Sequence, residues 1–296
     1  MPSKRVQNSV RFRPAFTDKV VQMIYTVLLI PLLGIVLFFQ WERLSKHRKQ
    51  QRRVQLCARR LPAQWQQLLA SDFPLYRALP PDLQRKLEGH IQVFLDEKVF
   101  VGCNGFVITD EVRVLIAAQA CVLILNIPGD YFPGFQTILV YPHTYVAETS
   151  RYENGLQTDS VHARAGESWH RGPVIVAWDQ VVRGATSSRD GHNVVMHEFA
   201  HKLDEENHHM DGLPVLSDPQ QYSAWAKVLS AEYERLCNEG GGVIDDYGAT
   251  SAAEFFAVIT EVFFERPRAL QQQHPELYHQ LQQYYRLHPV EWGNHT

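Results

Sequence analysis

The sequence lacks the cysteine pairs that hold small secreted folds or zinc ribbons together. Its 296 residues include four cysteines, which lie far apart with no C-x-x-C pair among them. This spacing excludes a cysteine-based zinc module and gives no sign of a disulfide framework. We therefore expect reduced thiols, as in a cytoplasmic domain, at Cys57, Cys103, Cys121 and Cys237.

The chain also lacks a large excess of charge of either sign. Its 29 Lys and Arg residues face 32 Asp and Glu residues, which leaves a formal net charge of −3. A surface that coats nucleic acid would be strongly positive, so we predict no direct nucleic-acid binding. Internal repeats are absent as well, and the 45% hydrophobic and 21% charged residues are typical of a globular protein.

One long hydrophobic run is present, from Met23 to Phe39, without a charged residue. As a helix it would be about 26 Å long, close to the roughly 30 Å hydrocarbon core of a bilayer. We therefore predict a membrane-spanning helix over residues 20–41. The basic segment 42–60 follows it, and the positive-inside tendency then places a single-pass protein in the inner membrane with its C-terminal part in the cytoplasm. The alternative is a cytoplasmic protein in which this helix is buried or binds a partner.

These features divide the chain into a basic tail (1–19), the predicted span (20–41), a basic juxtamembrane segment (42–60) and a globular domain (61–290). Helical spacing of apolar residues fills positions 61–98, with a break at Pro80-Pro81. Short apolar runs bounded by Gly, Pro and Asp predict strands at Val122–Ile127, Thr137–Tyr141 and Val174–Trp178. Further helices are predicted at Gly191–Asp204, Gln220–Cys237, Ser251–Glu265 and Pro267–Leu287.

The motif that carries chemistry is H-E-x-x-H, formed by His197, Glu198 and His201. On a helix, positions i and i+4 share one face, so both imidazoles can bind one metal ion at about 2.0–2.1 Å. Glu198 points beside the metal, where it can act as the general base. Asp190 is the predicted N-cap. The helix is apolar nearly all round, which predicts a place in the protein interior.

A catalytic zinc needs a third protein ligand and an open position for water. The H-x-x-G-x-x-H extension fails, because Asp204 and Asn207 replace the Gly and the third His. A glutamate from the apolar helix 251–265 is the other solution. Glu254 is our choice, modestly ahead of Glu261, although Ser251-x-x-Glu254 is also a capping-box pattern.

The chain resembles the Mlc titration factor A family of zinc-dependent peptidases. The matching stretches are FVGCNGFVITDEVRVLIAAQACVLILN from Phe100, ILVYP from Ile138, WDQVVRGA from Trp178, DGHNVVMHEFAHKLD from Asp190 and YGATSAAEFFAVITEVFF from Tyr247. They occur in the family's order and cover most of the globular part.

This resemblance implies a gluzincin-like site related to the catalytic domain of anthrax lethal factor. It implies that His197, His201 and Glu254 bind one Zn²⁺, that Glu198 is the base, and that Tyr247 donates a hydrogen bond to the oxyanion. It also implies binding to the transcriptional repressor Mlc. Apart from the resemblance, Asp204 is a candidate hydrogen-bond partner for a ligand histidine.

The sequence therefore predicts an α+β, mostly helical, zincin-like metallopeptidase domain with a small β-sheet, preceded by a membrane-spanning helix. Its expected activity is hydrolysis of peptide substrates by a metal-activated water. The alternative is a regulatory binding protein that sequesters a transcriptional repressor and does not need the zinc site for this.

Overall fold

The computed structural model describes residues 15–153, 156–164, 166–168, 172–187, 189–216 and 218–293, with the side chains of 15–22, 24–32 and 145–168 left out. The chain divides into two compact units, Met1–Gln55 and Leu56–Thr296. The predicted N-terminal tail 1–19 lies mostly outside the described residues.

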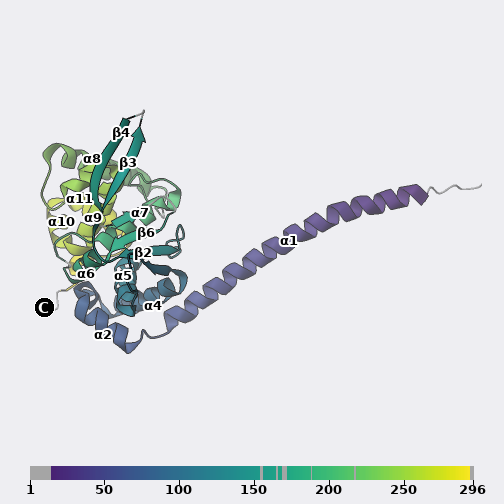
Figure 1. The fold of residues 1–296 in the computed structure, drawn as a ribbon, viewed down its shortest axis with the longest axis horizontal. Coiled ribbons are helices and arrows are strands. Elements are labelled where there is room, and N and C mark those ends of the chain that lie inside the picture. Colours follow the sequence, from purple (N-terminus) through teal and green to yellow (C-terminus); the bar gives the residue numbers. More distant parts are fainter. Residues whose placement is uncertain are drawn as a thin grey trace, which may run out of the picture. The chain divides into compact units, whose positions relative to one another are not determined.

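The described part of the first unit belongs to one helix, α1 (Ala15–Ala58, Figure 1), whose last residues from Leu56 on are counted with the second unit. Its described apolar side chains, from Leu33 to Trp41, are exposed. The helix does not end after this run but continues through the basic residues that follow Glu42.

The predicted fold class included a membrane-spanning helix over residues 20–41, and this prediction is wrong. Within the described part of the chain, no helix combines the length and the apolar character that crossing a membrane requires. The described apolar stretch Leu33–Trp41 would rise only about 14 Å as a helix, whereas the hydrocarbon core is roughly 30 Å thick. Residues 20–22 and 24–32 lie outside the residues whose side chains are described.

The second unit begins with helices, as the spacing predicted, and they are α2 (Ala63–Asp72), α3 (Pro74–Ala78) and α4 (Pro81–Glu97). Strand β1 (Val99–Gly102) and helix α5 (Asp110–Leu123) follow. The strand predicted at Val122–Ile127 is wrong, because Val122 belongs to the last turn of α5. Every residue of α5 from Val114 on is buried, so the run has no amphipathic period that separates helix from strand.

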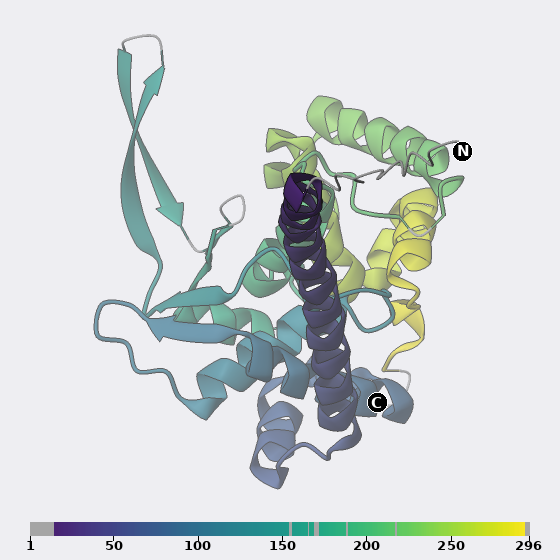
Figure 2. The ribbon, with the colours of Figure 1, turned by 90° about the vertical axis from the view of Figure 1, so that its right-hand side faces the viewer.

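A four-stranded sheet lies beside these helices, in the order β1-β2-β6-β5. Strands β2 (Thr137–Tyr141) and β6 (Val174–Ala177) confirm two predicted strands. The first three strands are parallel, and β5 (Gly166–Ser168) runs antiparallel to β6. A separate two-stranded ribbon, β3 (Tyr145–Glu153) with β4 (Leu156–Arg164), extends from the sheet region in Figures 1 and 2.

The remaining helices complete the second unit. They are α6 (Trp178–Thr186), α7 (Val194–Asp204), α8 (Gln221–Glu239), α9 (Ala252–Glu265), α10 (Pro267–Gln273) and α11 (Pro275–Tyr285). Short 3₁₀ turns lie at η1 (Glu205–Asn207), η2 (Asp246–Thr250) and η3 (Pro289–Glu291). Pro275 divides the helix predicted at Pro267–Leu287 in two, because proline removes a helical hydrogen bond.

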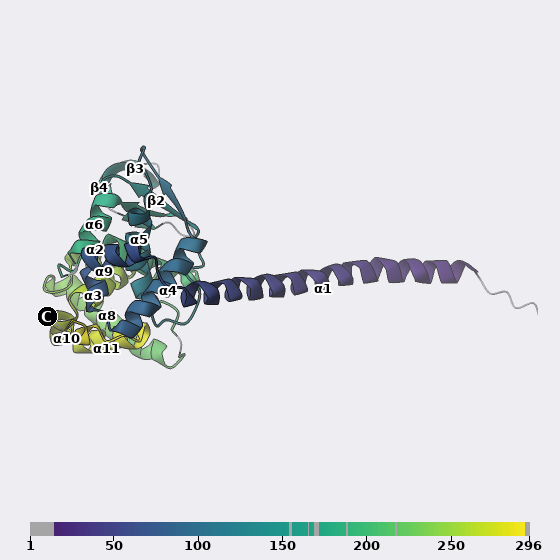
Figure 3. The same ribbon diagram turned by 90° about the horizontal axis from the view of Figure 1, so that it is seen from below.

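Helices α7 and α9 form the centre of this unit. Helix α7 contacts α5, α6, β5 and β6 on one side and α9 on the other, while α9 contacts α10 and α11. Figure 1 shows strands β2 and β6 and helices α10 and α11 on opposite sides of this pair, and Figure 3 shows β2 and the same two helices on opposite sides of α9. The buried ring of Phe199 packs on Phe94, Phe132 and Phe135. The two apolar helices are therefore held in the core, as the sequence predicted for α7.

Candidate metal centre

The N-terminus of α7 is capped by Asn193, whose Oδ1 accepts a hydrogen bond from the backbone N–H of Met196 at 3.0 Å. The prediction of Asp190 as the cap is wrong. Gly191, at φ +86°, turns the chain between Asp190 and the helix, and Asp190 instead accepts from the backbone N–H of His192 at 3.0 Å. The helix therefore begins at Val194, one turn before Glu198.

The two histidines of the motif lie one above the other on α7, as their spacing predicted. Their Nε2 atoms are 3.2 Å apart and their rings meet at 83°. His201 is buried and His197 is largely so. Both Nε2 atoms therefore face the same small volume at the surface of α7.

Glu254 reaches this volume from the first turn of α9. Its Oε2 lies 2.9 Å from Nε2 of His197 and 3.3 Å from Nε2 of His201. Ser251 does cap α9, since its hydroxyl accepts from the backbone N–H of Glu254 at 3.2 Å. The cap thus uses the backbone of Glu254 and leaves its carboxylate directed at the histidines.

The geometry of the three atoms fits a divalent metal ion. Ligand atoms about 2.0–2.1 Å from a tetrahedral zinc lie about 3.3–3.4 Å from one another. The three ligand atoms form a triangle with edges of 2.9, 3.2 and 3.3 Å. Two imidazoles and one carboxylate form the only group of this kind among the residues that the structure describes. Their role as ligands remains a prediction.

Glu261 does not join this group but contacts the opposite side of one imidazole. Its Oε1 lies 2.7 Å from Nδ1 of His197. A carboxylate is an acceptor only, so Nδ1 carries a proton and donates it. Glu261 therefore takes the place for which Asp204 was a candidate, and Asp204 instead accepts from the backbone N–H of Gly212 at 2.8 Å.

The charges around the histidines explain their different pKa values. Burial lowers the pKa of both rings, but at His197 the hydrogen bonds to Glu254 and Glu261 outweigh burial and raise its pKa well above the usual value. Burial prevails at His201, whose pKa is lowered. At Glu254 the two histidines outweigh burial and lower the pKa. Without a metal ion, His197 therefore holds a proton that metal binding has to displace.

Glu198 and Tyr247 lie within the stretch of sequence that the three residues of this group span. Glu198 is 4% exposed on α7, directly after His197. Tyr247 is 55% exposed on η2, with its ring 5.9 Å from that of His197. Burial and the charges of Glu254 and Glu198 raise the pKa of Tyr247, so this hydroxyl keeps its proton at neutral pH.

The backbone of Tyr247 is held by Asp245, the residue that precedes and caps η2. Asp245 accepts a hydrogen bond from the backbone N–H of Tyr247 at 2.8 Å. The preceding loop contains three consecutive glycines with positive φ, at positions 240–242. The tyrosine therefore stands on a short capped turn that follows a loop of unusual backbone conformation.

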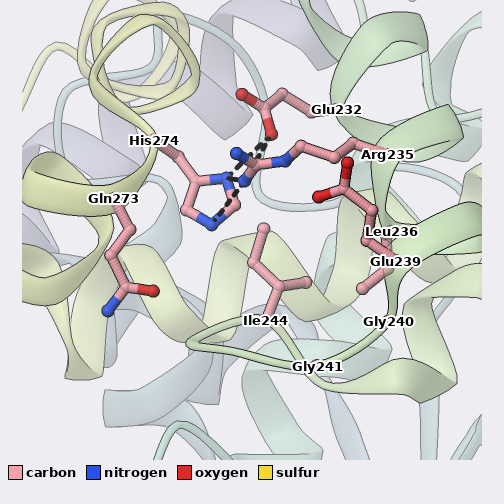
Figure 4. A pocket seen from close by; sticks show the side chains of 9 residues that line it. All are labelled: Glu232, Arg235, Leu236, Glu239, Gly240, Gly241, Ile244, Gln273 and His274. Atoms are coloured by element: carbon pink, nitrogen blue, oxygen red, sulfur yellow. Dashed lines mark hydrogen bonds and ion pairs between the residues drawn. The ribbon is translucent and has the colours of Figure 1, made fainter.

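A hollow of about 210 Å³ lies elsewhere, between α8 and the end of α10 (Figure 4). Oε2 of Glu232 lies 3.0 Å from Nη2 of Arg235 and 2.8 Å from Nδ1 of His274. The Glu232 carboxylate is therefore shared by two neighbouring side chains, and none of the predicted site residues lines the hollow. We assign no part of the metal chemistry to it.

Asn193, Glu261 and Glu265 are the residues near the site whose roles the sequence did not predict. The spacing of seven and four residues from Glu254 to Glu261 and Glu265 marked a stripe on one helix. It did not say which carboxylate would face a metal and which would face the backbone of α7.

Comparison with known proteins matches residues 45–286 to a family model described as glucose-regulated metallo-peptidase M90. A protein of Synechocystis sp. is 43% identical over 270 residues, which cover 89% of this chain and 97% of that protein. Mlc titration factor A of Escherichia coli O7:K1 is 30% identical over 252 residues, which cover 82% and 93%; that of Shigella flexneri matches to the same extent. These matches confirm the resemblance to the Mlc titration factor A proteins, and the chain belongs to the glucose-regulated metallo-peptidase M90 family.

Proposed function

We propose that this protein is a zinc-dependent peptidase in which His197, His201 and Glu254 hold the metal. The observation that carries the proposal is the convergence of two Nε2 atoms and one carboxylate oxygen within 3.3 Å of one another. Two imidazole nitrogens and a single carboxylate are a donor set typical of catalytic zinc, which leaves one position for water. Membership of a metallopeptidase family supports the same conclusion.

The chemistry that zinc supplies when bound is Lewis acidity, which makes a water molecule acidic near neutral pH and polarises a carbonyl group. Glu198 accepts the proton of the attacking water and then passes it to the departing amine. Tyr247 donates its O–H to the carbonyl oxygen as negative charge develops there. Both groups lie beside the three ligands, and neither is one of them.

The substrate that fits this site is a peptide in an extended conformation. Strand β5 is an edge of the four-stranded sheet and contacts α7, which carries the motif. The backbone of an edge strand can pair with an added strand. A peptide paired with β5 would run along the edge of the sheet that contacts α7.

The test is peptide hydrolysis by the full chain loaded with one equivalent of zinc. We expect cleavage of a mixed peptide library, its loss on removal of zinc with a chelator, and its recovery when zinc is returned. A protein that binds zinc at these residues but cleaves no peptide, in the library or in unfolded proteins, would contradict the peptidase assignment.

A second candidate function rests on the names of the relatives. Several proteins that are 30% identical to this chain are called Mlc titration factor A, which favours binding to a transcriptional repressor. We propose that such binding does not require zinc. If so, His197→Ala should keep repressor binding in a pull-down assay while peptide hydrolysis is lost. Loss of both together would tie the binding to the metal site.

A further inference from the structure

Glu261 contacts the backbone of α7 and the imidazole of His197 at the same time. Its Oε1 lies 2.7 Å from Nδ1 of His197, and its Oε2 accepts a hydrogen bond from the backbone N–H of Asn193. Glu261 is 5% exposed and lies two turns of α9 beyond Glu254. One buried side chain therefore connects the cap of α7 with one of the proposed metal ligands.

We propose that Glu261 is a positioning residue: it holds the Nδ1 proton of His197 and so fixes both the tautomer and the direction of Nε2 towards the metal. This inference rests on the proposed zinc site. A histidine that donates its second N–H to a carboxylate is a stronger and better oriented ligand. Because one oxygen of Glu261 faces Nδ1 of His197 and the other accepts from the backbone of Asn193, Glu261 acts through His197 and is not itself a ligand.

Asn193, whose backbone N–H donates to Glu261, belongs to a network at the N-terminus of α7. The side chain of Asn193 donates to the carbonyl of Gly184 and to Oε1 of Glu265, both at 3.1 Å. Oε2 of Glu265 accepts from the backbone N–H of Gly191 at 3.0 Å. A Cβ atom at Gly184 would lie 2.9 Å from Cγ of Asn193, so this approach requires glycine.

The second histidine provides the contrast. Nδ1 of His201 is buried and has no hydrogen-bond partner among the residues that the structure describes. Its direction is set by packing on α7 and by the contacts of Nε2. The carboxylate therefore controls only one of the two imidazoles, and its loss should weaken metal binding without removing a ligand.

Glu265 offers a matched control for Glu261. Both are buried glutamates on α9, one helical turn apart, and each accepts two hydrogen bonds from the α7 cap region or its imidazole. Only Glu261 touches His197. Glu261→Gln and Glu265→Gln therefore disturb the same network by the same chemical change, and they differ in the contact with the ligand.

The experiment measures zinc affinity by competition with a chromophoric chelator for the full chain and both variants, together with the visible spectrum of the cobalt-substituted forms. Loss of a carboxylate behind a ligand histidine typically lowers metal affinity about 10–100-fold. We expect that loss and a changed cobalt spectrum in Glu261→Gln. In Glu265→Gln we expect lower thermal stability with zinc affinity within about twofold of wild type, since no ligand contact is removed.

Equal losses of affinity in the two variants would reduce Glu261 to a structural role and overturn the inference, as would no loss in either. Tight zinc binding by the wild type would leave the proposed site intact in both cases. Absence of zinc binding by the wild type would instead overturn the proposed function and this inference together.

A measurement on the wild type alone covers the case in which the Glu261 variant does not fold. In the zinc-loaded protein labelled with ¹⁵N, the His197 imidazole should show a proton on Nδ1 that exchanges slowly with water. A proton on Nε2, with Nδ1 bound to zinc, would overturn the inference without reference to any variant.

Discussion

The two ends of α7 are held in the structure by different means, although each carries one of the two histidines. At the N-terminal end, Asn193 and His197 are tied to α9 by the carboxylates of Glu261 and Glu265. At the C-terminal end, Asp204 is tied to the loop backbone at Gly212, and Lys202 pairs with Glu205 at 2.8 Å. The first end is linked to the helix that also supplies Glu254, and the second end is linked to a loop.

This difference indicates how the three proposed ligands keep their positions relative to one another. Glu254 and Glu261 belong to one buried helix, so the contact of Glu261 with His197 holds this histidine against the helix that supplies Glu254. The backbone of Gly212 is further fixed, because Trp225 donates its indole N–H to the Gly212 carbonyl at 3.2 Å. The C-terminal end of α7, which carries His201, is therefore also held by residues that belong to neither α7 nor α9.

The variants with the largest expected effect test whether each end of α7 supplies a ligand. His197→Ala and His201→Ala should each lower zinc affinity by on the order of 10³-fold or more, since a zinc binding energy of about 10–16 kcal/mol is shared by few ligands. Zinc content after dialysis against a chelator measures this. His209→Ala, at an exposed histidine outside the group, is the control and should keep its zinc. Retention of zinc by either variant would show that the replaced histidine, at that end of α7, is not a ligand.

A slightly smaller effect is expected for the base that lies between the histidines. Glu198→Gln should lower kcat by about 10²–10⁴-fold, because proton transfer is lost while the carboxamide keeps the volume of the side chain. Zinc stoichiometry should stay at one, as measured by elemental analysis. Glu239→Gln, on the exposed side of α8, should leave both values unchanged. A Glu198→Gln protein with wild-type kcat would exclude the general-base role.

Tyr247 is expected to contribute less, because it is half exposed and water can partly replace its hydroxyl. Tyr247→Phe should lower kcat by about 10²-fold, the lower end of the range for one oxyanion donor, with little change in KM. Steady-state kinetics on one cleaved peptide distinguish the two parameters. A rise in KM with unchanged kcat would show that the tyrosine binds substrate and does not stabilise the transition state.

The smallest effects concern stability and compare the two ends of α7 directly. Burial raises the pKa of Glu265 to about 8 and that of Asp204 to about 6. Such a carboxyl takes up a proton on folding, so its stabilisation is complete below its unfolded pKa and is lost as pH rises through its folded pKa. The free energy of unfolding of the metal-free protein should therefore fall from pH 4.5 to about 8 through Glu265, and from pH 3.8 to about 6 through Asp204.

Urea unfolding of the metal-free protein between about pH 4 and 9 separates the two contributions, with a slope of at most about 1.4 kcal/mol per pH unit for each group. Glu265→Gln and Asp204→Asn cannot titrate. Wild type should lose stability relative to each variant only within the window of the replaced residue. A difference that stays constant with pH would show that the folded pKa of that group is not raised.

The sequence predicted the parts of the site that depend on local geometry. His197 and His201 needed only a helix, since four residues bring them to one face. The third proposed ligand does not follow from local geometry, because Glu254 and Glu261 lie on the same helix and only tertiary packing decides which of them meets Nε2 and which meets Nδ1. The resemblance to a known family favoured Glu254, and the structure places this residue beside both histidines.

The errors also have physical reasons. Asp190 precedes α7 and is a residue type that often caps helices. The chain turns at Gly191, however, and Asn193 is the residue that caps the helix. The run Val122–Ile127 was read as a strand because a segment buried on all sides shows no period. The first error comes from a turn in the adjacent sequence, and the second comes from burial by other parts of the chain, which the local sequence does not show.

The most direct test of the central claim is a crystal structure of the zinc-loaded protein with an anomalous difference map recorded at the zinc absorption edge. We predict one strong peak within about 2.0–2.2 Å of Nε2 of His197, Nε2 of His201 and a carboxylate oxygen of Glu254, with Glu261 still hydrogen-bonded to Nδ1 of His197. A peak at other residues, or no peak between α7 and α9, would contradict the proposed metal centre and the peptidase mechanism built on it.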